Sequence, residues 1–482
     1  MHDRPSDGLT AGPIHAQDIQ LQTLRTRHDN SLWVYFGTIL LGCWLLTAPA
    51  ILGYLDSDFP QRVFDVTQER GLAEPLLRAQ WLMWSDMLSG ALLVLFGGLS
   101  LFWRHRWAQW ASCLVGLWLI SAPLLFWAPS AAIYANETLV GGLVIAFAIL
   151  IPPMPGTSVA ALQAKDDIPP GWDYSPSSWS QRLPIIVLAF VGFFIARYLS
   201  AYQLGHIETV WDPFFGDGTA RIITSEVSHA WPVADAGLGA MTYLIEALSG
   251  MMGDSRRWRT MPWMVGLFGV LVIPLGGVSI FFIVIQPIVI GTWCTLCLIS
   301  AAAMVIMLPY SFDEIVAMGQ FVLRARREGQ GLWRVFWRGG SASGGRVAGG
   351  PPLRIGSSGD GERFAQIRAL PKGLILCALL GAWLMFTRLI FGTEGALADS
   401  DHLIGAMLFT FSIAAFSEVF RPLRAINFLF AGWLLLAPWL LEGGGLASTL
   451  NSMVVGILVI VLTLPRGPIR NRYGSWDRFI TW

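Results

Sequence analysis

Two cysteines with a redox-type spacing are the residues in this chain whose types best suit chemistry. Cys294 and Cys297 belong to the run GTWCTLC that begins at Gly291. A Cys-x-x-Cys pair on one helix brings its sulfurs close enough to form a disulfide, and such pairs often have perturbed thiol acidity. Zinc would need two further ligands, and the neighbouring sequence has no second cysteine pair or histidine cluster. The spacing therefore favours thiol-disulfide chemistry over a metal, with two buried structural cysteines as the alternative.

The composition places this pair in a membrane protein. The chain has 482 residues, of which 54% are hydrophobic and 13% are charged, and it contains 23 tryptophans. A soluble domain carries about 25% charged residues, and 5 cysteines cannot staple a secreted scaffold of this length. Lys and Arg equal Asp and Glu in number, which argues against a nucleic-acid binder. We therefore predict an all-α polytopic membrane protein in contact with lipid.

About twelve segments are long and apolar enough to cross a bilayer, because one spanning helix needs about 20 mainly apolar residues. The weakest are 236–252, which contains Glu246, and 427–441, which is short. The predicted spans are 32–55, 82–102, 109–127, 137–154, 183–203, 236–252, 262–284, 288–308, 372–391, 402–420, 427–441 and 450–464.

Arginine clusters lie on every second connection between these spans. They occur at 104–106, 256–259 and 466–478, whereas the connections at 128–136 and 392–401 contain no Lys or Arg. Positively charged short loops stay in the cytoplasm. Both termini are therefore predicted to be cytoplasmic, and the Cys-x-x-Cys pair is predicted to lie toward the outer side.

A Trp followed five residues later by Pro recurs inside the spans. It occurs at Trp44, Trp118 and Trp433, and in degenerate form at Trp383, where Arg388 takes the proline position. Ser and Asn suit a helix N-cap and Gly lets membrane helices approach closely, so each copy with its following span predicts a helical hairpin. The motif resembles the SPW repeat, a bacterial membrane module of unknown activity. The Ser or Asn and Gly positions are Ser85 and Gly90, Asn136 and Gly141, Ser400 and Gly405, and Asn451 and Gly456.

Two pairs of hairpin repeats bracket a central four-helix block that lacks the Trp-to-Pro motif. The stretch after this block is rich in Gly, Ser and Arg, and its apolar content is too low for it to fold alone. The expected segments are a cytoplasmic tail at 1–31, a repeat pair at 32–155, a linker at 156–182, the central block at 183–322, a flexible cytoplasmic linker at 323–371, a second repeat pair at 372–465 and a cytoplasmic tail at 466–482.

The central block has a further set of features in common with a known family. It combines a long first outer loop, the series Pro232, Gly239 and Tyr243 leading into the second span, and a Cys-x-x-Cys at the start of the fourth. Over residues 183–322 this arrangement resembles the vitamin K epoxide reductase family. The resemblance implies a four-helix bundle in which Cys294 and Cys297 exchange electrons with a quinone, ubiquinone or menaquinone.

The resemblance also assigns roles to neighbouring residues. It places Trp293, Gly239 and Tyr243 at the quinone site. Asp235 stands where many members have an Asn near the quinone, and Ser228 corresponds to a Ser of the outer loop. These assignments are expectations from the resemblance.

The chain departs from the family in its first outer loop. The loop 204–235 has no cysteine, so the internal relay of the family is missing, and Ala301 stands where vitamin K-reducing members have Tyr. The resemblance then implies an external dithiol protein of the periplasm in place of the loop cysteines. We expect the outer thiol, Cys294, to meet this partner and Cys297 to face the quinone, so that Cys297→Ser would trap the partner on Cys294.

Two charged residues within the central spans need partners, because charges in lipid are costly. Arg197 and Glu246 lie on adjacent spans at comparable depth, and we expect a structural ion pair between them to support the site, with a proton relay as the alternative.

Two other functions stay open at this stage. The central block could be an inactive scaffold that binds partners. The repeated hairpins also suggest a transporter, although transporters usually hold ion ligands at the membrane midplane. The resemblances favour the bacterial inner membrane as the location, and the sequence specifies no oligomeric state.

Overall fold

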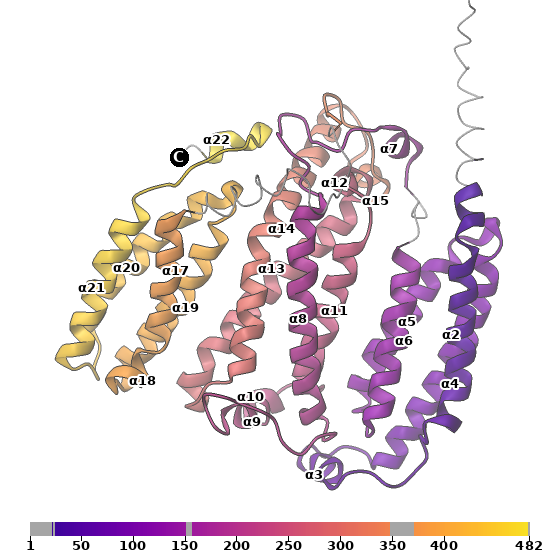
Figure 1. Cartoon of the computed structure of the whole chain (residues 1–482), viewed down its shortest axis with the longest axis horizontal. Coiled ribbons are helices and arrows are strands. Elements are labelled where there is room, and N and C mark those ends of the chain that lie inside the picture. The colour runs from indigo at the N-terminus through magenta and orange to yellow at the C-terminus, as the bar shows by residue number, and fades with distance from the viewer. Residues whose placement is uncertain (1–21, 23–24, 151–156, 348–370, 481–482) are drawn as a thin grey trace, which may run out of the picture. The chain divides into compact units, whose positions relative to one another are not determined.

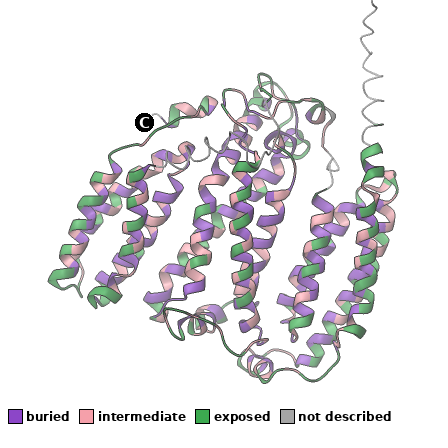
Figure 2. Cartoon of the chain, viewed as in Figure 1, coloured by how far each residue is buried: buried purple, intermediate pink, exposed green. Residues whose placement is uncertain are grey.

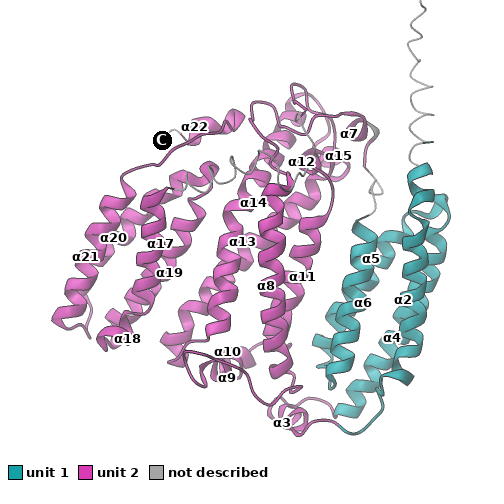
Figure 3. Ribbon diagram, viewed as in Figure 1, with its two compact units in different colours: residues 1–58, 75–155 teal, residues 59–74, 156–482 magenta. Residues whose placement is uncertain are grey.

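The computed structural model describes residues 22, 25–150, 157–347 and 371–480 (Figure 1). Within these ranges every regular element is a helix, apart from two isolated β-bridges. The prediction of an all-α fold is therefore confirmed. The chain divides into two compact units (Figure 3): unit 1 comprises residues 1–58 and 75–155, and unit 2 comprises residues 59–74 and 156–482.

Each predicted span corresponds to a helix. In the part of the chain that the structure describes, nine helical segments are long and apolar enough to cross a membrane. The other three predicted spans are α11 (Asp235–Met251), α17 (Lys372–Met385) and α19 (Gly395–Ala414), which are shorter or more polar. Large apolar side chains such as Leu40 and Val270 are exposed, and Figure 2 shows exposed positions along the helices. Such surfaces suit lipid contact, and the protein is a multi-pass membrane protein.

Unit 1 consists of two helical hairpins. Gly42 and Gly90 let the helices of the first hairpin approach closely, since a Cβ added to Gly42 would lie 2.7 Å from the carbonyl oxygen of Gly90. The close approach of glycines expected from the repeat is confirmed. The helices are α2 (Leu32–Ile51), α4 (Pro75–Ser100), α5 (Ala108–Leu125) and α6 (Ala131–Ile149), with the short helix η1 (Trp103–His105) between α4 and α5.

Unit 2 contains the central bundle and the second pair of hairpins. The bundle comprises α8 (Trp179–Gln203), α11, α13 (Pro262–Ile285) and α14 (Thr295–Arg327), and its outer loop carries α9 (Gly218–Ile223) and α10 (Glu226–His229). The hairpins comprise α17, α18 (Thr387–Phe391), α19, η3 (Glu418–Ala425), α20 (Ile426–Leu440) and α21 (Leu446–Thr463). The remaining short helices are α3 (Gln61–Glu69), α7 (Val159–Gln163), α12 (Arg257–Thr260), α15 (Leu332–Arg338), η4 (Gly474–Trp476) and α22 (Asp477–Ile480).

The two ends of unit 2 differ in composition. Figure 1 shows α12, α15 and α22 at one end, and α9 and α10 at the other, where α14 begins. The arginine-rich segments and the Cys-x-x-Cys pair therefore lie at opposite ends, as a single membrane orientation requires. Which end faces the cytoplasm stays a prediction.

The motif tryptophans connect the two hairpins of each pair. In all four cases the indole N–H donates to the Ser or Asn of the partner hairpin, at 2.8 or 2.9 Å. The expected N-cap role of Ser and Asn is therefore wrong, because these residues lie inside their helices and accept indole hydrogen bonds. The hydrogen bonds are Trp44 to Asn136, Trp118 to Ser85, Trp383 to Asn451 and Trp433 to Ser400.

The segment expected to be a flexible linker from residue 323 is partly folded. α14 continues to Arg327, and α15 follows after a short turn. Trp337 of α15 stacks on Trp263 of α13, and Val335 is buried. The apolar residues of this segment suffice for one helix, although Gly, Ser and Arg dominate the composition. Residues 348–370 of the predicted linker lie outside the described residues, as does most of the predicted tail at 1–31.

Candidate redox centre

The Cys pair lies at the start of α14. A disulfide joins Cys294 and Cys297, whose Cα atoms are 5.2 Å apart. Cys294 caps α14, and its sulfur accepts a hydrogen bond from the backbone N–H of Cys297 at 3.0 Å. Cys294 is fully buried among apolar residues that include Ile223 of the outer loop, whereas Cys297 is partly exposed. Cys294 is therefore covered in this disulfide-bonded state, and the expectation that it meets a partner protein stays a prediction.

The turn that leads into Cys294 is held by Gln286. The backbone forms one π-helical turn, η2 (Gln286–Ile290), and Gly291 follows with φ of +76°, a conformation that favours glycine. The side-chain oxygen of buried Gln286 accepts a hydrogen bond from the N–H of Cys294 at 3.1 Å. The predicted eighth span began at 288, but α14 begins only after this turn. The position of the Cys pair therefore depends on the end of α13.

Asp212 ties the outer loop to the start of α14. Its carboxylate accepts hydrogen bonds from the hydroxyl groups of Thr219 and Thr295, both at 2.6 Å. The N–H groups of Phe214 and Phe215 donate to it at 3.1 and 3.0 Å. Burial acts to raise the pKa of Asp212, but these hydrogen bonds outweigh it and hold the pKa well below its usual value. Sequence reasoning missed Asp212, although Asp followed by Pro is a turn signal.

Trp293 belongs to an aromatic cluster beside the disulfide. Its ring stacks on Phe215 of the outer loop, with centroids 5.6 Å apart. Phe386 and His402, from the second repeat pair, lie 6.1 and 6.3 Å from it. Trp293 is 4% exposed, and its indole N–H has no hydrogen-bond partner among the described residues. This N–H is a buried donor that an acceptor on a small molecule would satisfy.

Asp235 and Ser228, both assigned by the resemblance, lie in one hydrogen-bonded network. The carboxylate of Asp235 accepts hydrogen bonds from the side-chain amide of Gln203, from the Ser228 hydroxyl at 3.1 Å and from the N–H of Ala236 at 2.8 Å. Gln203 also donates to the Ser228 oxygen at 2.6 Å. Gln203 was missed because a lone Gln at a helix end carries no motif. The network joins the ends of α8 and α11 to the outer loop.

Tyr243 contacts the helix that carries the Cys pair. It is 4% exposed, and its hydroxyl lies 2.9 Å from both the carbonyl and the hydroxyl oxygen of Ser300, three residues after Cys297. Gly239 lies one turn earlier on α11, where an added Cβ would meet Ala196 of α8 at 3.6 Å. Tyr243 therefore contacts α14 one turn after Cys297, while Gly239 faces α8.

The expected ion pair between Arg197 and Glu246 does not form. Glu246 is fully buried, and neither carboxylate oxygen has a hydrogen-bond partner in the described part of the chain. Because Ala196 faces Gly239, Arg197 lies about two helical turns from Glu246, roughly 10 Å along the axis at about 1.5 Å per residue. The buried ion pair of the bundle is instead Arg257 with Glu314, at 2.5 Å.

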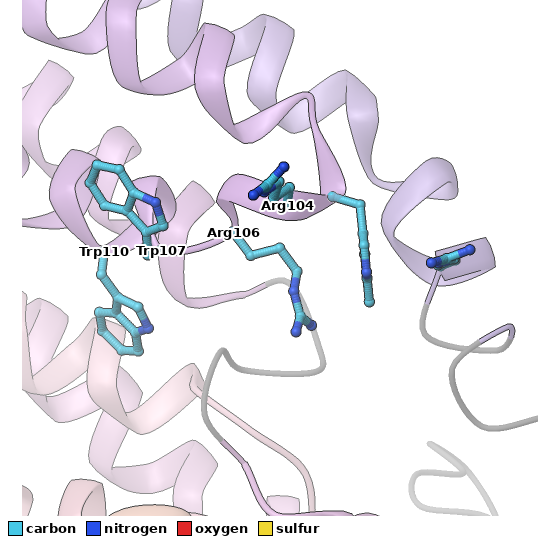
Figure 4. Close-up of a pocket in the computed structure, with 6 residues that line it drawn as sticks. Arg104, Arg106, Trp107 and Trp110 are labelled. Carbon is cyan, nitrogen blue, oxygen red and sulfur yellow. The ribbon is translucent and has the colours of Figure 1, made fainter. Parts of the chain in front are cut away.

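A pocket of about 710 Å³ lies in unit 1 and is basic and aromatic in character (Figure 4). It contains no cysteine or acidic side chain, so it is separate in composition from the redox centre. Within the described residues, no three His, Cys, Asp or Glu side chains gather as metal ligands would. The pocket is lined by Arg25, Trp103, Arg104, Arg106, Trp107 and Trp110.

The fold and the centre define a polytopic membrane protein with a disulfide-bonded Cys pair at one end of a four-helix bundle. The model of the Vitamin K epoxide reductase family matches residues 183–312, and that of the SPW repeat domain matches residues 72–151 and 374–465. Both resemblances drawn from the motifs are thus confirmed, and the central match indicates a redox-related membrane protein. No curated protein and no solved structure matches the chain.

Proposed function

We propose that this chain is an inner-membrane thiol-disulfide oxidoreductase that passes electrons between the Cys294–Cys297 pair and a membrane quinone, ubiquinone or menaquinone. The observation that carries the proposal is the disulfide at the N-terminus of α14, inside a module that the Vitamin K epoxide reductase family model matches. We assign the chain to the bacterial cytoplasmic membrane, with both termini in the cytoplasm. The redox end then faces the periplasm, because the arginine-rich end of unit 2 is the opposite one.

An external dithiol protein supplies the electrons in this proposal, since the outer loop has no cysteine. A thiolate of the partner attacks the sulfur of Cys297, the more exposed cysteine, and the bond to Cys294 breaks. Cys294 leaves as a thiolate that the N–H of Cys297 and the helix N-terminus stabilise. The second partner thiol then attacks the partner sulfur of the mixed disulfide, and Cys297 leaves as a thiolate that takes up a proton. The partner ends as a disulfide and the chain as a dithiol, so two electrons and two protons have moved.

A bound quinone supplies a two-electron, two-proton acceptor, which returns the dithiol to the disulfide. The unpartnered N–H of Trp293 fits this group, because a quinone presents carbonyl oxygens as acceptors. The phenol of Tyr243 is held at Ser300, one turn beyond Cys297, and lines the same part of α14. Asp235 and Ser228 act indirectly. Their hydrogen bonds with Gln203 fix the outer loop against the start of α11, beside the site.

The response of the Cys pair to the quinone pool tests the proposal. Cys43, Cys113 and Cys377 are free, so a variant with these three replaced by Ala leaves two thiols to count. In membranes, a mass-tagged thiol reagent should find the pair oxidised when the quinone pool is oxidised and reduced when respiration is blocked downstream of it. A pair that stays oxidised under both conditions would reject the proposal in favour of the scaffold alternative.

Partner trapping tests the order of attack. Burial of Cys294 reverses the sequence-based expectation, so Cys294→Ser should accumulate a reducible adduct on Cys297 and Cys297→Ser should not. The double variant is the control for adducts on other cysteines. An adduct confined to Cys297→Ser would show that the outer loop opens and that Cys294 is attacked first.

A further inference from the structure

The third hairpin consists of α17, α18 and α19. It departs from the repeat pattern where it contacts the redox centre. Arg388 replaces the Pro found at this position in the other three copies. His402 follows the Ser-Asp of its hairpin, where the other copies have Met87, Thr138 and Met453. Among the four hairpins, this one packs α19 against α13 and α14 of the central bundle. Arg388 and His402, the residues that differ from the other copies, therefore belong to the hairpin that packs on the central bundle.

His402 contacts two backbone carbonyl groups. Each lies where a neighbouring helix is interrupted, so neither accepts the usual helical hydrogen bond. Its Nε2 lies 3.0 Å from the oxygen of Ile283, which has no helical donor four residues on because that residue is Pro287. Its Nδ1 lies 3.0 Å from the oxygen of Met385, where α17 ends. The N–H that would continue this helix, at Leu389, bonds to Phe386 instead. One side chain thus joins the end of α13 to the end of α17.

The protonation state of His402 decides how many of these contacts are hydrogen bonds. A neutral imidazole has one N–H and can donate to one carbonyl, whereas the imidazolium donates to both. The charged groups beside it are Arg388 and Asp399, which pair with each other, and α13 contributes no charged side chain. His402 is 2% exposed, so water cannot replace a missing donor at either carbonyl.

Arg388 makes a second link to the same turn. One guanidinium nitrogen donates to the carbonyl oxygen of Pro287 at 2.9 Å, and another pairs with Asp399. Pro287 lies inside η2, next to Gln286, whose side chain holds the N–H of Cys294. The chain of contacts therefore runs from the third hairpin through 283–287 to the redox cysteine.

We propose that Arg388 and His402 are positioning residues of the redox centre, and that the second repeat pair fixes the turn from which Cys294 is held. The role of these residues in electron transfer rests on the proposed function, whereas their effect on the Cys294–Cys297 disulfide does not. Loosening the turn frees the N–H of Cys294 from Gln286 and exposes the start of α14. The balance between disulfide and dithiol then shifts.

The test restores the residues of the other repeats in the full chain. Arg388→Pro and His402→Met remove the contacts with the turn but keep side chains that the other hairpins accommodate. Trp433→Phe is the matched control, because it removes the hydrogen bond to Ser400 within the repeat pair and touches nothing in the turn. The ratio of disulfide to dithiol at Cys294 and Cys297 is measured by mass tagging after equilibration with reduced and oxidised dithiothreitol.

Each restoring variant should shift this ratio by roughly tenfold, the scale of one or two lost hydrogen bonds, and the control should leave it within about twofold of the wild type. Arg388→Lys and His402→Gln each keep one donor of the two native contacts, so they should shift the ratio in the same direction as the restoring variants but by less, which keeps the test decisive where a restoring variant fails to fold. Ratios equal to the wild type in all four variants, or an equal shift in the control, would overturn the inference. If the wild type equilibrates with dithiothreitol but ignores the quinone pool, the proposed function fails while this test still stands.

Discussion

The two repeat pairs share one scheme of hydrogen bonds but differ at their centres. In the first pair, the carboxyl groups of Asp86 and Glu137 are fully buried, and the phenol of Tyr54 donates to Asp86 at 2.6 Å, whereas neither oxygen of Glu137 has a hydrogen-bond partner among the described residues. In the second pair, Asp401 faces Ser452, whose hydroxyl lies 3.2 Å from both carboxylate oxygens. Two buried carboxylates repel each other, so the first centre combines like charges, whereas in the second a hydroxyl donates to Asp401.

This difference shows where each pair has specialised. The first pair keeps the proline of the motif in both hairpins and carries its unusual group in the interior. The second pair has an ordinary interior, and its unusual residues, Arg388 and His402, face the redox bundle. Both repeat pairs therefore keep the four indole hydrogen bonds, whereas the residues in the interior of a pair and those that contact the central bundle differ between the pairs.

Copying the first centre into the second should have the largest effect. Ser452→Glu places a second carboxyl beside Asp401 without a phenol to help, because Thr393 occupies the position that Tyr54 has in the first pair. We expect a loss of about 3 kcal/mol in the free energy of unfolding, the scale for a poorly partnered acid in a membrane. Thermal unfolding in detergent measures it. Glu137→Ser is the reciprocal control and should change stability by less than about 1 kcal/mol; comparable losses in both would refute the distinction between the centres.

Glycine replacement compares two hairpins within the second pair. A Cβ at Gly381 would lie 2.6 Å from the backbone nitrogen of Phe409, whereas one at Gly456 would lie 3.1 Å from its nearest atom, on Ala431. Gly381→Ala should destabilise the protein by about 2 kcal/mol and Gly456→Ala by clearly less. The midpoints of thermal unfolding of the two variants decide the matter, and equal midpoints would mean that the helices separate freely.

Removal of one indole hydrogen bond should have the same small effect in both pairs. Trp118→Phe and Trp433→Phe each delete a bond to a Ser, at 2.9 and 2.8 Å. We expect each to lower the free energy of unfolding by about 0.6 kcal/mol, the average for such bonds between membrane helices. Unfolding curves recorded side by side give the difference. A loss in only one pair would show that the frame is not equivalent in the two.

Replacement of Asp212 should have the smallest effect, and it compares a half-buried acid of the outer loop with the fully buried acids of the repeat pairs. Its pKa is lowered in the folded state, so ionisation adds stability above the unfolded pKa of about 3.9, and this stability is lost as pH falls through the folded pKa. Asp212→Asn should therefore be slightly less stable than the wild type at neutral pH, and the two should converge below about pH 4. Unfolding midpoints across pH measure this, and a difference that grows in acid would contradict the assigned hydrogen bonds.

The sequence was informative where a short motif determines local structure. The Cys-x-x-Cys spacing identified the disulfide pair, and the Trp, Pro and Gly positions identified the hairpins, because both depend on residues close in the chain. The indole partners could not be predicted, since the bond from Trp44 to Asn136 joins residues 92 positions apart. The absent ion pair of Arg197 depended on helix register, which hydropathy does not contain.

The parts of the redox centre that escaped prediction are single polar residues outside the motifs. Asp212 lies in the outer loop and Gln286 in the turn η2, and neither belongs to a recognisable pattern. The departure of Arg388 from the motif was visible in the sequence, but its meaning required knowledge of the neighbour that it contacts. Polar residues that connect modules are therefore the ones that sequence patterns describe least well.

The exchange of indole hydrogen bonds between hairpins has a consequence for biosynthesis. Each hairpin donates one bond and accepts one, so neither can complete its polar contacts until the other has been translated and inserted. The first hairpin of a pair must wait in the bilayer with an unsatisfied indole N–H and an unsatisfied Ser. A ribosome that stalls between the two hairpins would leave a product that quality-control proteases can recognise. The smallest part of this repeat that can form all of its indole hydrogen bonds is thus a pair of hairpins, with four helices, and not a single hairpin with two.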